Sequence, residues 1–249
     1  EKINRNSPLT FEEEVERQEF ELKVDSICKM AKNKNVSVFI DAEESWIQNT
    51  IDNVAEKMME KYNKQKAIVF NTVQLYRKDR IEYIESLIAK AEEKYFIGLK
   101  LVRGAYHEQE ISRAITNKYH IPVHTHKSKT DKDYNTAIKL CIQNIKRIAI
   151  CAGTHNEKSI NFLVTLMKDY NLNNDDNRIY FSQLLGMSDH ISYNLSAENY
   201  NTSKYVPYGP VRDVMPYLIR RAEENTSISG QMGRELTNII AERKRRKKN

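Results

Sequence analysis

Hydrophobic residues along the chain follow two different patterns. Six short runs are rich in β-branched and aromatic residues, and those that are apolar at consecutive positions, such as Ala67–Phe70, are typical of strands covered on both faces. The predicted strands are Val36–Ile40, Ala67–Val73, Phe96–Val102, Arg147–Cys151, Ile179–Leu184 and Lys204–Val206.

The segments between most of these runs repeat their apolar residues with a helical period. In Trp46–Tyr62, for example, Ile47, Ile51, Val54 and Met58 lie on one stripe, and charged residues occupy the other side. The predicted helices are about Thr10 to Lys32, Trp46–Tyr62, Asp79–Lys94, Lys132–Lys146, Glu157–Tyr170 and Val211–Asn225. Strands that alternate with helices predict βαβ units and a mainly parallel sheet.

Some segments add detail to this pattern. Thr10 with Glu13 fits a capping box at the start of the first helix. The polar stretch Tyr119–Asp133 is predicted to be a mobile loop, and Ser188–Ser203 is less regular than the other connections. Because no linker or change in composition interrupts the chain, we expect residues 1–249 to form one domain.

Each predicted strand ends in polar residues or glycine. The six groups are Asp41–Glu44, Asn71–Gln74, Arg103–Tyr106, Gly153–Asn156, Gln183–Gly186 and Pro207–Gly209. In parallel α/β folds, ligands bind at the carboxyl ends of the strands. The repetition at six strand ends therefore indicates an enzyme or a small-ligand binder.

Two of these polar groups, and a pair of arginines on a predicted helix, also have a simpler structural explanation. The carboxylates between Asp41 and Glu44 could start a helix, where they favour the helix dipole. His155–Asn156 could cap the helix that follows. Arg220–Arg221 could be a solvated helix face.

Composition excludes several classes of protein. Seven glycines include neither GxGxxG nor GxxxxGK[ST], so neither kind of glycine-rich phosphate cradle is present. Cys28, Cys141 and Cys151 lack metal-type spacing and cannot all pair, which fits a reducing compartment. His120, His124 and His126 lack partner carboxylates at suitable spacing, so we predict no metal.

The net charge of +6 lies in a C-terminal tail, Arg243–Lys248. Without the tail's six cations, Lys and Arg would number 34 and equal Asp and Glu. The body is therefore neutral, and we predict no nucleic-acid partner. No apolar run reaches the roughly 18 residues of a membrane span.

The polar strand ends belong to longer motifs that occur in a recognisable order. They are Asp41–Glu44, Gln74–Tyr76, Lys100–Tyr106, Thr154–Asn156, Gln183–Met187, Lys204–Gly209 and Tyr217–Asn225. The ordered set, which covers Lys23 to Ser227, resembles the proline dehydrogenase family in its monofunctional form. The resemblance implies an α/β fold, a (β/α)8 barrel that binds FAD. It also implies oxidation of L-proline to Δ1-pyrroline-5-carboxylate, by hydride transfer to flavin N5, and a quinone as electron acceptor.

The resemblance also assigns a substrate site. Paired arginines would bind the proline carboxylate, a glutamate would hold one of them, an aspartate would organise them, and apolar residues would enclose the ring. The matching residues are Arg220, Arg221, Glu224, Asp41, Tyr205, Tyr217 and Leu184 or Leu185. Tyr205 closes the space that a ring hydroxyl would need, so we expect proline rather than hydroxyproline, although a hydroxyproline dehydrogenase is an open alternative.

A second set of residues matches the family's flavin contacts. Gln74 and Lys100 match positions beside the isoalloxazine, and Gln183 matches the pocket wall. The dinucleotide side is matched by Arg103, Gly104, Tyr106, Thr154, His155 and Asn156. Side-chain cations at the pyrophosphate would explain dinucleotide binding without a glycine-rich loop.

The family barrel has eight strands, and only six are predicted here. The other two would precede Glu1, so we expect this chain to be a fragment or a processed piece. An inactive barrel remnant that acts as a binding module is therefore an alternative to an enzyme, and a nucleic-acid binder that uses the basic tail is a third.

Quinone reduction implies contact with a membrane surface. The basic segment Met232–Lys248 could provide this contact, although a solvated tail is the simpler reading. The sequence leaves open a bacterial cytoplasm with peripheral inner-membrane contact or a mitochondrion, and it does not indicate an oligomeric state.

Overall fold

A computed structural model of the chain describes residues 1–3, 7–92, 94–227, 240 and 243–246, with the backbone only for 220–227. The chain divides into two compact units, Glu1–Tyr205 and Val206–Asn249. Each unit is described by itself below. None of the described helices is long and apolar enough to span a membrane.

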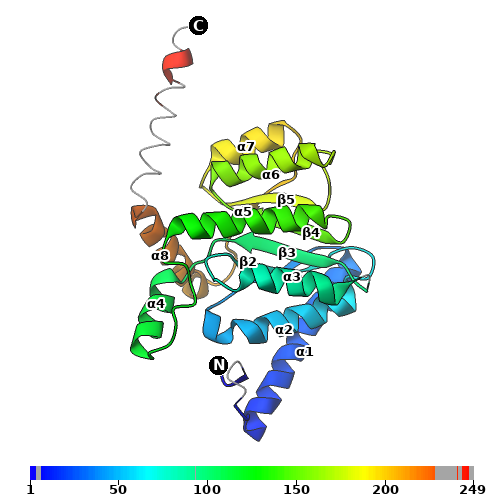
Figure 1. The fold of residues 1–249 in the computed structure, drawn as a ribbon, viewed down its shortest axis with the longest axis vertical. Helices are drawn as coiled ribbons and strands as arrows, with labels where there is room; N and C mark the ends of the chain where they lie inside the picture. Colours follow the sequence, from blue (N-terminus) through cyan, green and yellow to red (C-terminus); the bar gives the residue numbers. More distant parts are fainter. Residues whose placement is uncertain (4–6, 93, 228–239, 241–242, 247–249) are drawn as a thin grey trace. The chain divides into compact units, whose positions relative to one another are not determined.

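The first unit is built on a parallel sheet of six strands in sequence order, as the alternating pattern predicts (Figure 1). The strands are β1 (Val38–Ile40), β2 (Val69–Gln74), β3 (Ile97–Val102), β4 (Ile148–Gly153), β5 (Ile179–Leu184) and β6 (Thr202–Tyr205). The helices of this unit are α1 (Phe11–Lys34), α2 (Ser45–Tyr62), α3 (Arg80–Ala91), α4 (His107–Thr116), α5 (Lys127–Gln143), α6 (Glu157–Asp169) and α7 (Asp189–Ala197).

The two faces of the sheet differ because side chains alternate along each strand. In β2, Asn71 bonds to α2, so Val69, Asn71 and Val73 lie on the face that the helices cover. Phe70 and Thr72 alternate with these residues and therefore lie on the opposite face. There Phe70 packs edge-on against Phe39, with ring centroids 5.3 Å apart. Phe39 is 44% exposed, so this second face is the more open one.

The predicted helix start at Thr10 is confirmed. The Thr10 hydroxyl accepts a hydrogen bond from the Glu13 amide at 3.2 Å, and the Glu13 carboxylate accepts one from the Thr10 amide at 2.8 Å. This reciprocal pair satisfies two donors that the first turn of a helix would leave unpaired.

The prediction of a mobile loop over Tyr119–Asp133 is wrong in its second half. Helix α5 begins at Lys127, five residues before the predicted start at Lys132, and Val123 forms an isolated bridge with Arg77. The polar first turn of α5 is held by an ion pair between Asp131 and Arg103 of the preceding strand end. A contact across 28 residues cannot be read from local hydrophobic periodicity.

Two helices lie in segments for which no regular element was predicted. Helix α4 occupies the connection after β3, and α7 occupies most of the irregular segment Ser188–Ser203. In the second unit, helix α8 (Val211–Ser227) covers the predicted helix Val211–Asn225. Most of the predicted basic helix Met232–Lys248 lies outside the described residues.

Candidate active site

The carboxyl ends of the first three strands bring charged and polar side chains together on the open face of the sheet. The Lys100 ammonium from β3 forms an ion pair with the Asp41 carboxylate after β1. Asp41 also accepts a hydrogen bond of 3.3 Å from the Thr72 hydroxyl of β2. Lys100 lies 5.4 Å from the ring centroid of Phe39, so its charge is held over an aromatic face. These strand ends thus place a cation on the open face.

Two buried glutamine side chains connect neighbouring strand ends. The Gln74 amide donates to the Glu43 carbonyl at 2.7 Å and accepts from the Ala105 amide at 3.1 Å. The Gln183 amide donates to the Thr154 carbonyl at 3.2 Å and accepts from the Ser192 hydroxyl at 2.8 Å. Each glutamine therefore uses both ends of its side chain to fix the shape of the rim.

Arg103 connects three elements through its guanidinium group. Its Nε donates to Asp131 at 2.7 Å, Nη1 to the Thr154 hydroxyl at 2.5 Å and Nη2 to the Ser159 hydroxyl at 2.9 Å. The group also stacks over the Tyr134 ring, 4.4 Å from its centroid. Arg103 is therefore a cation of fixed position whose three nitrogens already have protein partners.

The pKa of Asp131 makes this cluster sensitive to acid. Burial alone would raise the pKa of the carboxyl, but hydrogen bonding and charge from Arg103, together with Lys127, hold it below the usual value of 3.8. Because the folded pKa is the lower one, the stabilisation is fully present above the unfolded pKa and is lost as the pH falls through the folded pKa.

We expect Asp131→Asn to remove this pH dependence. At pH 7 the variant should unfold at a lower urea concentration than wild type, and below about pH 4 the difference should shrink. Asp175→Asn serves as a control because Asp175 is exposed and lies in a polar turn. Urea unfolding at pH 7 and pH 3 measures the midpoints of both variants. If Asp131→Asn lowers the urea midpoint equally at the two pH values, the expectation is contradicted.

The turn after β3 contains Gly104 and Tyr106. Gly104 has a φ of +135°, and a Cβ at this position would lie 2.4 Å from Cδ1 of Tyr76. The position thus requires glycine for two reasons, its backbone conformation and the ring packed against it. The Tyr106 hydroxyl donates to the Glu43 carboxylate, which ties this turn to the segment after β1.

The segment after β4 confirms the cap interpretation for one of its residues. Asn156 is the N-cap of α6, and its side chain accepts hydrogen bonds from the amides of Lys158 and Ser159 at 3.0 and 3.3 Å. His155 Nδ1 lies 3.0 Å from the Ser188 hydroxyl. His155 therefore connects the ends of β4 and β5, and it lies at the same rim as Thr154 and Gln183.

The proposed substrate residues are distributed over both units. Leu185 and Tyr205 lie at the ends of β5 and β6, where the Leu185 amide donates to the Tyr205 carbonyl at 3.0 Å. Their side chains are 59% and 43% exposed, so apolar surface is available at this rim. Tyr217 lies in α8 of the second unit. Arg220, Arg221 and Glu224 also belong to α8, but their side chains lie outside the described part of the structure.

Several residues that shape this rim were missed by the sequence analysis. They are Glu110, Asp131, Tyr134 and Ser159. A weak signal existed for Glu110, since residues 107–116 combine charged residues with Ile111, Ala114 and Ile115 in a helix-compatible spacing. The others can be recognised only from their contact with a strand end that is remote in sequence.

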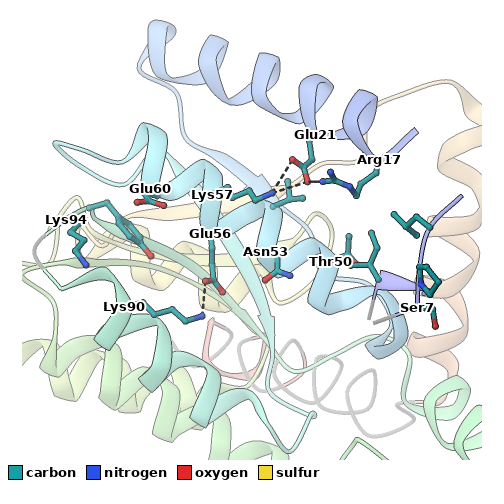
Figure 2. A pocket seen from close by; sticks show the side chains of 15 residues that line it. Ser7, Arg17, Glu21, Thr50, Asn53, Glu56, Lys57, Glu60, Lys90 and Lys94 are labelled. Carbon is teal, nitrogen blue, oxygen red and sulfur yellow. Dashed lines mark hydrogen bonds and ion pairs between the residues drawn. The ribbon is translucent and has the colours of Figure 1, made fainter. Parts of the chain in front are cut away.

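Figure 2 shows a different pocket, which lies among the helices and the N-terminal segment. Its volume is about 820 Å³, and its lining includes Lys90 near the end of α3 and Lys94 and Tyr95 in the segment before β3. Charged groups in its wall pair with one another, as Lys57 does with Glu21 at 3.2 Å and Lys90 with Glu56 at 3.3 Å. Because this pocket lies away from the carboxyl ends of the strands, we do not assign it to the site. No group of three or more His, Cys, Asp or Glu within the described residues could hold a metal ion.

The first unit thus has the architecture of a parallel β/α protein with its polar residues at the carboxyl edge of the sheet. Residues 1–234 match the family model described as proline dehydrogenase. The chain therefore belongs to the proline dehydrogenase family.

Relatives of known name agree with this assignment. The chain is 36% identical to proline dehydrogenase 1, mitochondrial, of Drosophila melanogaster, over 90% of this chain and 34% of the relative. It is 36% identical to the human protein of the same name, over 92% of this chain and 39% of the relative. It is 37% identical to proline dehydrogenase 2, mitochondrial, of Arabidopsis thaliana, over 92% of this chain and 50% of the relative. The chain thus spans between about a third and a half of these relatives' lengths.

Solved structures confirm the fold. The chain superposes on proline utilization A from Bdellovibrio bacteriovorus, inactivated by N-propargylglycine, with a TM-score of 0.79 and 24% identity. The match covers 86% of this chain and 22% of the other. A bifunctional proline utilization A protein matches with a TM-score of 0.72 over the same shares. The predicted barrel of the proline dehydrogenase kind, six strands of which lie in the described residues, is therefore confirmed.

Proposed function

We propose that this chain forms part of a proline dehydrogenase that oxidises L-proline to Δ1-pyrroline-5-carboxylate in proline catabolism. Family membership supports this proposal, and one structural observation carries it. The ammonium of Lys100 is held on the open face of the sheet by Asp41, at the strand ends where parallel α/β folds bind their ligands. Exposed apolar side chains at β5 and β6 provide the complementary surface for a small ring.

The donor set of this rim suits FAD. Lys100 would lie beside the isoalloxazine. Arg103 and His155 would lie beside the dinucleotide part of the cofactor. Two fixed cations favour an anionic diphosphate and a reduced, negatively charged ring system. Arg103 would act mainly through its charge, because its three nitrogens are bound to protein oxygens. When bound, FAD supplies the two-electron oxidation.

The remaining assignments concern substrate binding. We assign Arg220 and Arg221 to the carboxylate of proline, Glu224 to the orientation of Arg220, and Tyr205 with Tyr217 to the ring. A guanidinium group binds a carboxylate through two parallel hydrogen bonds, which would orient the substrate as well as bind it. The side chain of Leu185 would complete the apolar wall. With Tyr205 in place, hydroxyproline should be a poor substrate.

The electrons would pass to a quinone at a membrane surface, in keeping with the family resemblance. The cationic residues of Arg243–Lys248 would be attracted to anionic lipid. Three relatives cited above carry the name mitochondrial, which fits a mitochondrial location if the source is eukaryotic. A bacterial source would place the protein at the inner membrane instead.

An anaerobic titration of the full-length protein with L-proline tests the proposal. We expect flavin absorbance in the purified protein, bleaching on addition of L-proline, and little bleaching with hydroxyproline. Lys100→Met should lower the midpoint potential of the flavin, because a cation beside it favours the reduced form. Lys139→Met, at an exposed position of α5, is the matched control and should leave the potential unchanged. A protein that stays colourless with added FAD and ignores proline would favour the binding-module alternative.

A further inference from the structure

The connection between β1 and α2 carries Asp41, and a remote side chain holds the start of this helix. Glu44 occupies the N-cap position of α2 but makes no side-chain hydrogen bond to the helix. The first amides of a helix have no partner within the helix, so they need one elsewhere. Glu110 provides it, since its carboxylate accepts a hydrogen bond of 2.6 Å from the Ser45 amide.

The bond from Glu110 is part of a two-point contact. The second carboxylate oxygen of Glu110 accepts a hydrogen bond of 2.6 Å from the Ser45 hydroxyl. Both residues are thereby held in one relative orientation, although they are 65 positions apart in the sequence. Glu110 is 0% exposed, and a negative charge at the N-terminus of α2 is favoured by the helix dipole. Hydrogen bonds to a buried charged group are among the stronger ones in a protein.

The same segment is held at a second position by other residues. The Glu43 amide donates to the side-chain oxygen of Gln48 at 2.8 Å, and the Glu43 carbonyl accepts from Gln74 at 2.7 Å. The Glu43 carboxylate accepts from Tyr106, which precedes α4 directly. The connection that follows Asp41 is therefore held at two positions. Glu110 of α4 holds it at Ser45, and Gln48 of α2 and Gln74 of β2 hold it at Glu43.

We infer that Glu110 is a positioning residue, which sets the location of Asp41 by holding the start of α2. Glu110 contacts neither Lys100 nor Asp41, so any effect on them must pass through the segment Asp41–Ser45. This inference rests on the proposed function and on the role that the family resemblance implies for Asp41, which is to organise the arginines that bind the proline carboxylate. Displacement of Asp41 should then weaken substrate binding more than it slows turnover.

The test uses Glu110→Gln in the full-length protein. A glutamine is neutral, so both bonds lose the carboxylate charge, and the Ser45 hydroxyl can keep its bond only by turning to accept from the side-chain NH2. We expect the KM for L-proline to rise about tenfold with a smaller change in kcat, because a bond to a charged group contributes about 1.5 kcal/mol or more. Amide exchange of residues 41–47 should become faster in the same variant. Glu108→Gln, at an exposed position of the same helix, is the matched control and should change neither quantity.

Ser45→Ala provides a second variant, which carries the test if Glu110→Gln fails to fold. It removes one of the two bonds, so its KM should lie between those of wild type and Glu110→Gln. The double variant should behave like Glu110→Gln alone, since both changes act on one contact. Faster exchange with an unchanged KM would overturn the positioning role. A wild-type protein that does not oxidise proline would overturn the proposed function, while exchange of residues 41–47 would still show whether Glu110 holds this segment.

Discussion

Asp52→Ala is expected to lower the free energy of unfolding by about 3–5 kcal/mol, the typical cost of breaking a buried ion pair by removing one partner. Asp52 lies in α2 and is 4% exposed, and Arg80 at the start of α3 is 5% exposed. The Arg80 guanidinium donates to the Asp52 carboxylate at 2.7 Å. The other carboxylate oxygen accepts from Gln48 and Asn71, both at 2.8 Å.

The size of this effect follows from what the substitution leaves behind. Alanine would remove the partner of buried donors on Gln48 and Arg80, and Asn71 would keep only its bond to the Tyr83 hydroxyl. Arg80 keeps Asp79 as a partner, so the guanidinium charge is not left wholly unpaired. The variant should also loosen the candidate site, because Gln48 is the residue that accepts from the Glu43 amide.

Urea unfolding of the full-length protein measures this effect. Glu60→Ala, two helical turns further along α2 at an exposed position, is the matched control and should change stability by no more than about 0.5 kcal/mol. A loss below about 1 kcal/mol for Asp52→Ala would show that the network contributes little, and that the strand–helix packing around it holds α2 and α3 in place.

Gly104→Ala is expected to destabilise the protein by about 3 kcal/mol, from two causes of similar size. A φ of +135° is strained for any residue with a Cβ, at about 1–3 kcal/mol. The added Cβ would also lie 2.4–2.6 Å from three atoms of the Tyr76 ring. Tyr76 is 3% exposed, so its ring has little room to move, and overpacking of this kind costs about 1–3 kcal/mol.

Gly186→Ala separates the two causes. Gly186 has a φ of +76°, but a Cβ there would meet nothing within 4 Å, so the backbone strain alone should remain. We expect Gly186→Ala to lower the free energy of unfolding by about 1–2 kcal/mol, and Gly104→Ala to lower it clearly more. Thermal unfolding of both variants measures the difference, and equal losses would show that the Tyr76 ring moves aside at little cost. The Gly104 change should also disturb Tyr106 and its hydroxyl bond to Glu43.

The elements that the sequence predicted correctly are those with strong local patterns. The runs Ala67–Phe70, which leads into β2, and Ile148–Cys151 in β4 are apolar at every position, and such runs are typical of covered strands. The capping box at Thr10 is equally local, since its two partners lie three residues apart. The polar groups at the strand ends were also recognisable, because strands covered on both faces have no use for them.

The elements that were missed depend on contacts between distant residues. Helix α4 has a weak apolar stripe, and its buried Glu110 is bonded to Ser45 on another helix. The start of α5 is polar in sequence and is held by the bond from Arg103 to Asp131. The cap at Asn156 was an open alternative, and the amides of Lys158 and Ser159 show that its side chain caps α6. For α4 and the start of α5, the local pattern did not distinguish a helix from a loop.

The sequence by itself determined the alternation of strands and helices, the family, and the edge of the sheet at which the functional residues lie. This information is local, because burial on one or two faces imposes a period on consecutive side chains. Only the tertiary structure decided which atoms meet at that edge: Asp41 with Lys100, Arg103 with Asp131, and Glu110 with Ser45. Such pairs depend on strand order and register, which are set by the packing of the whole sheet rather than by any short segment.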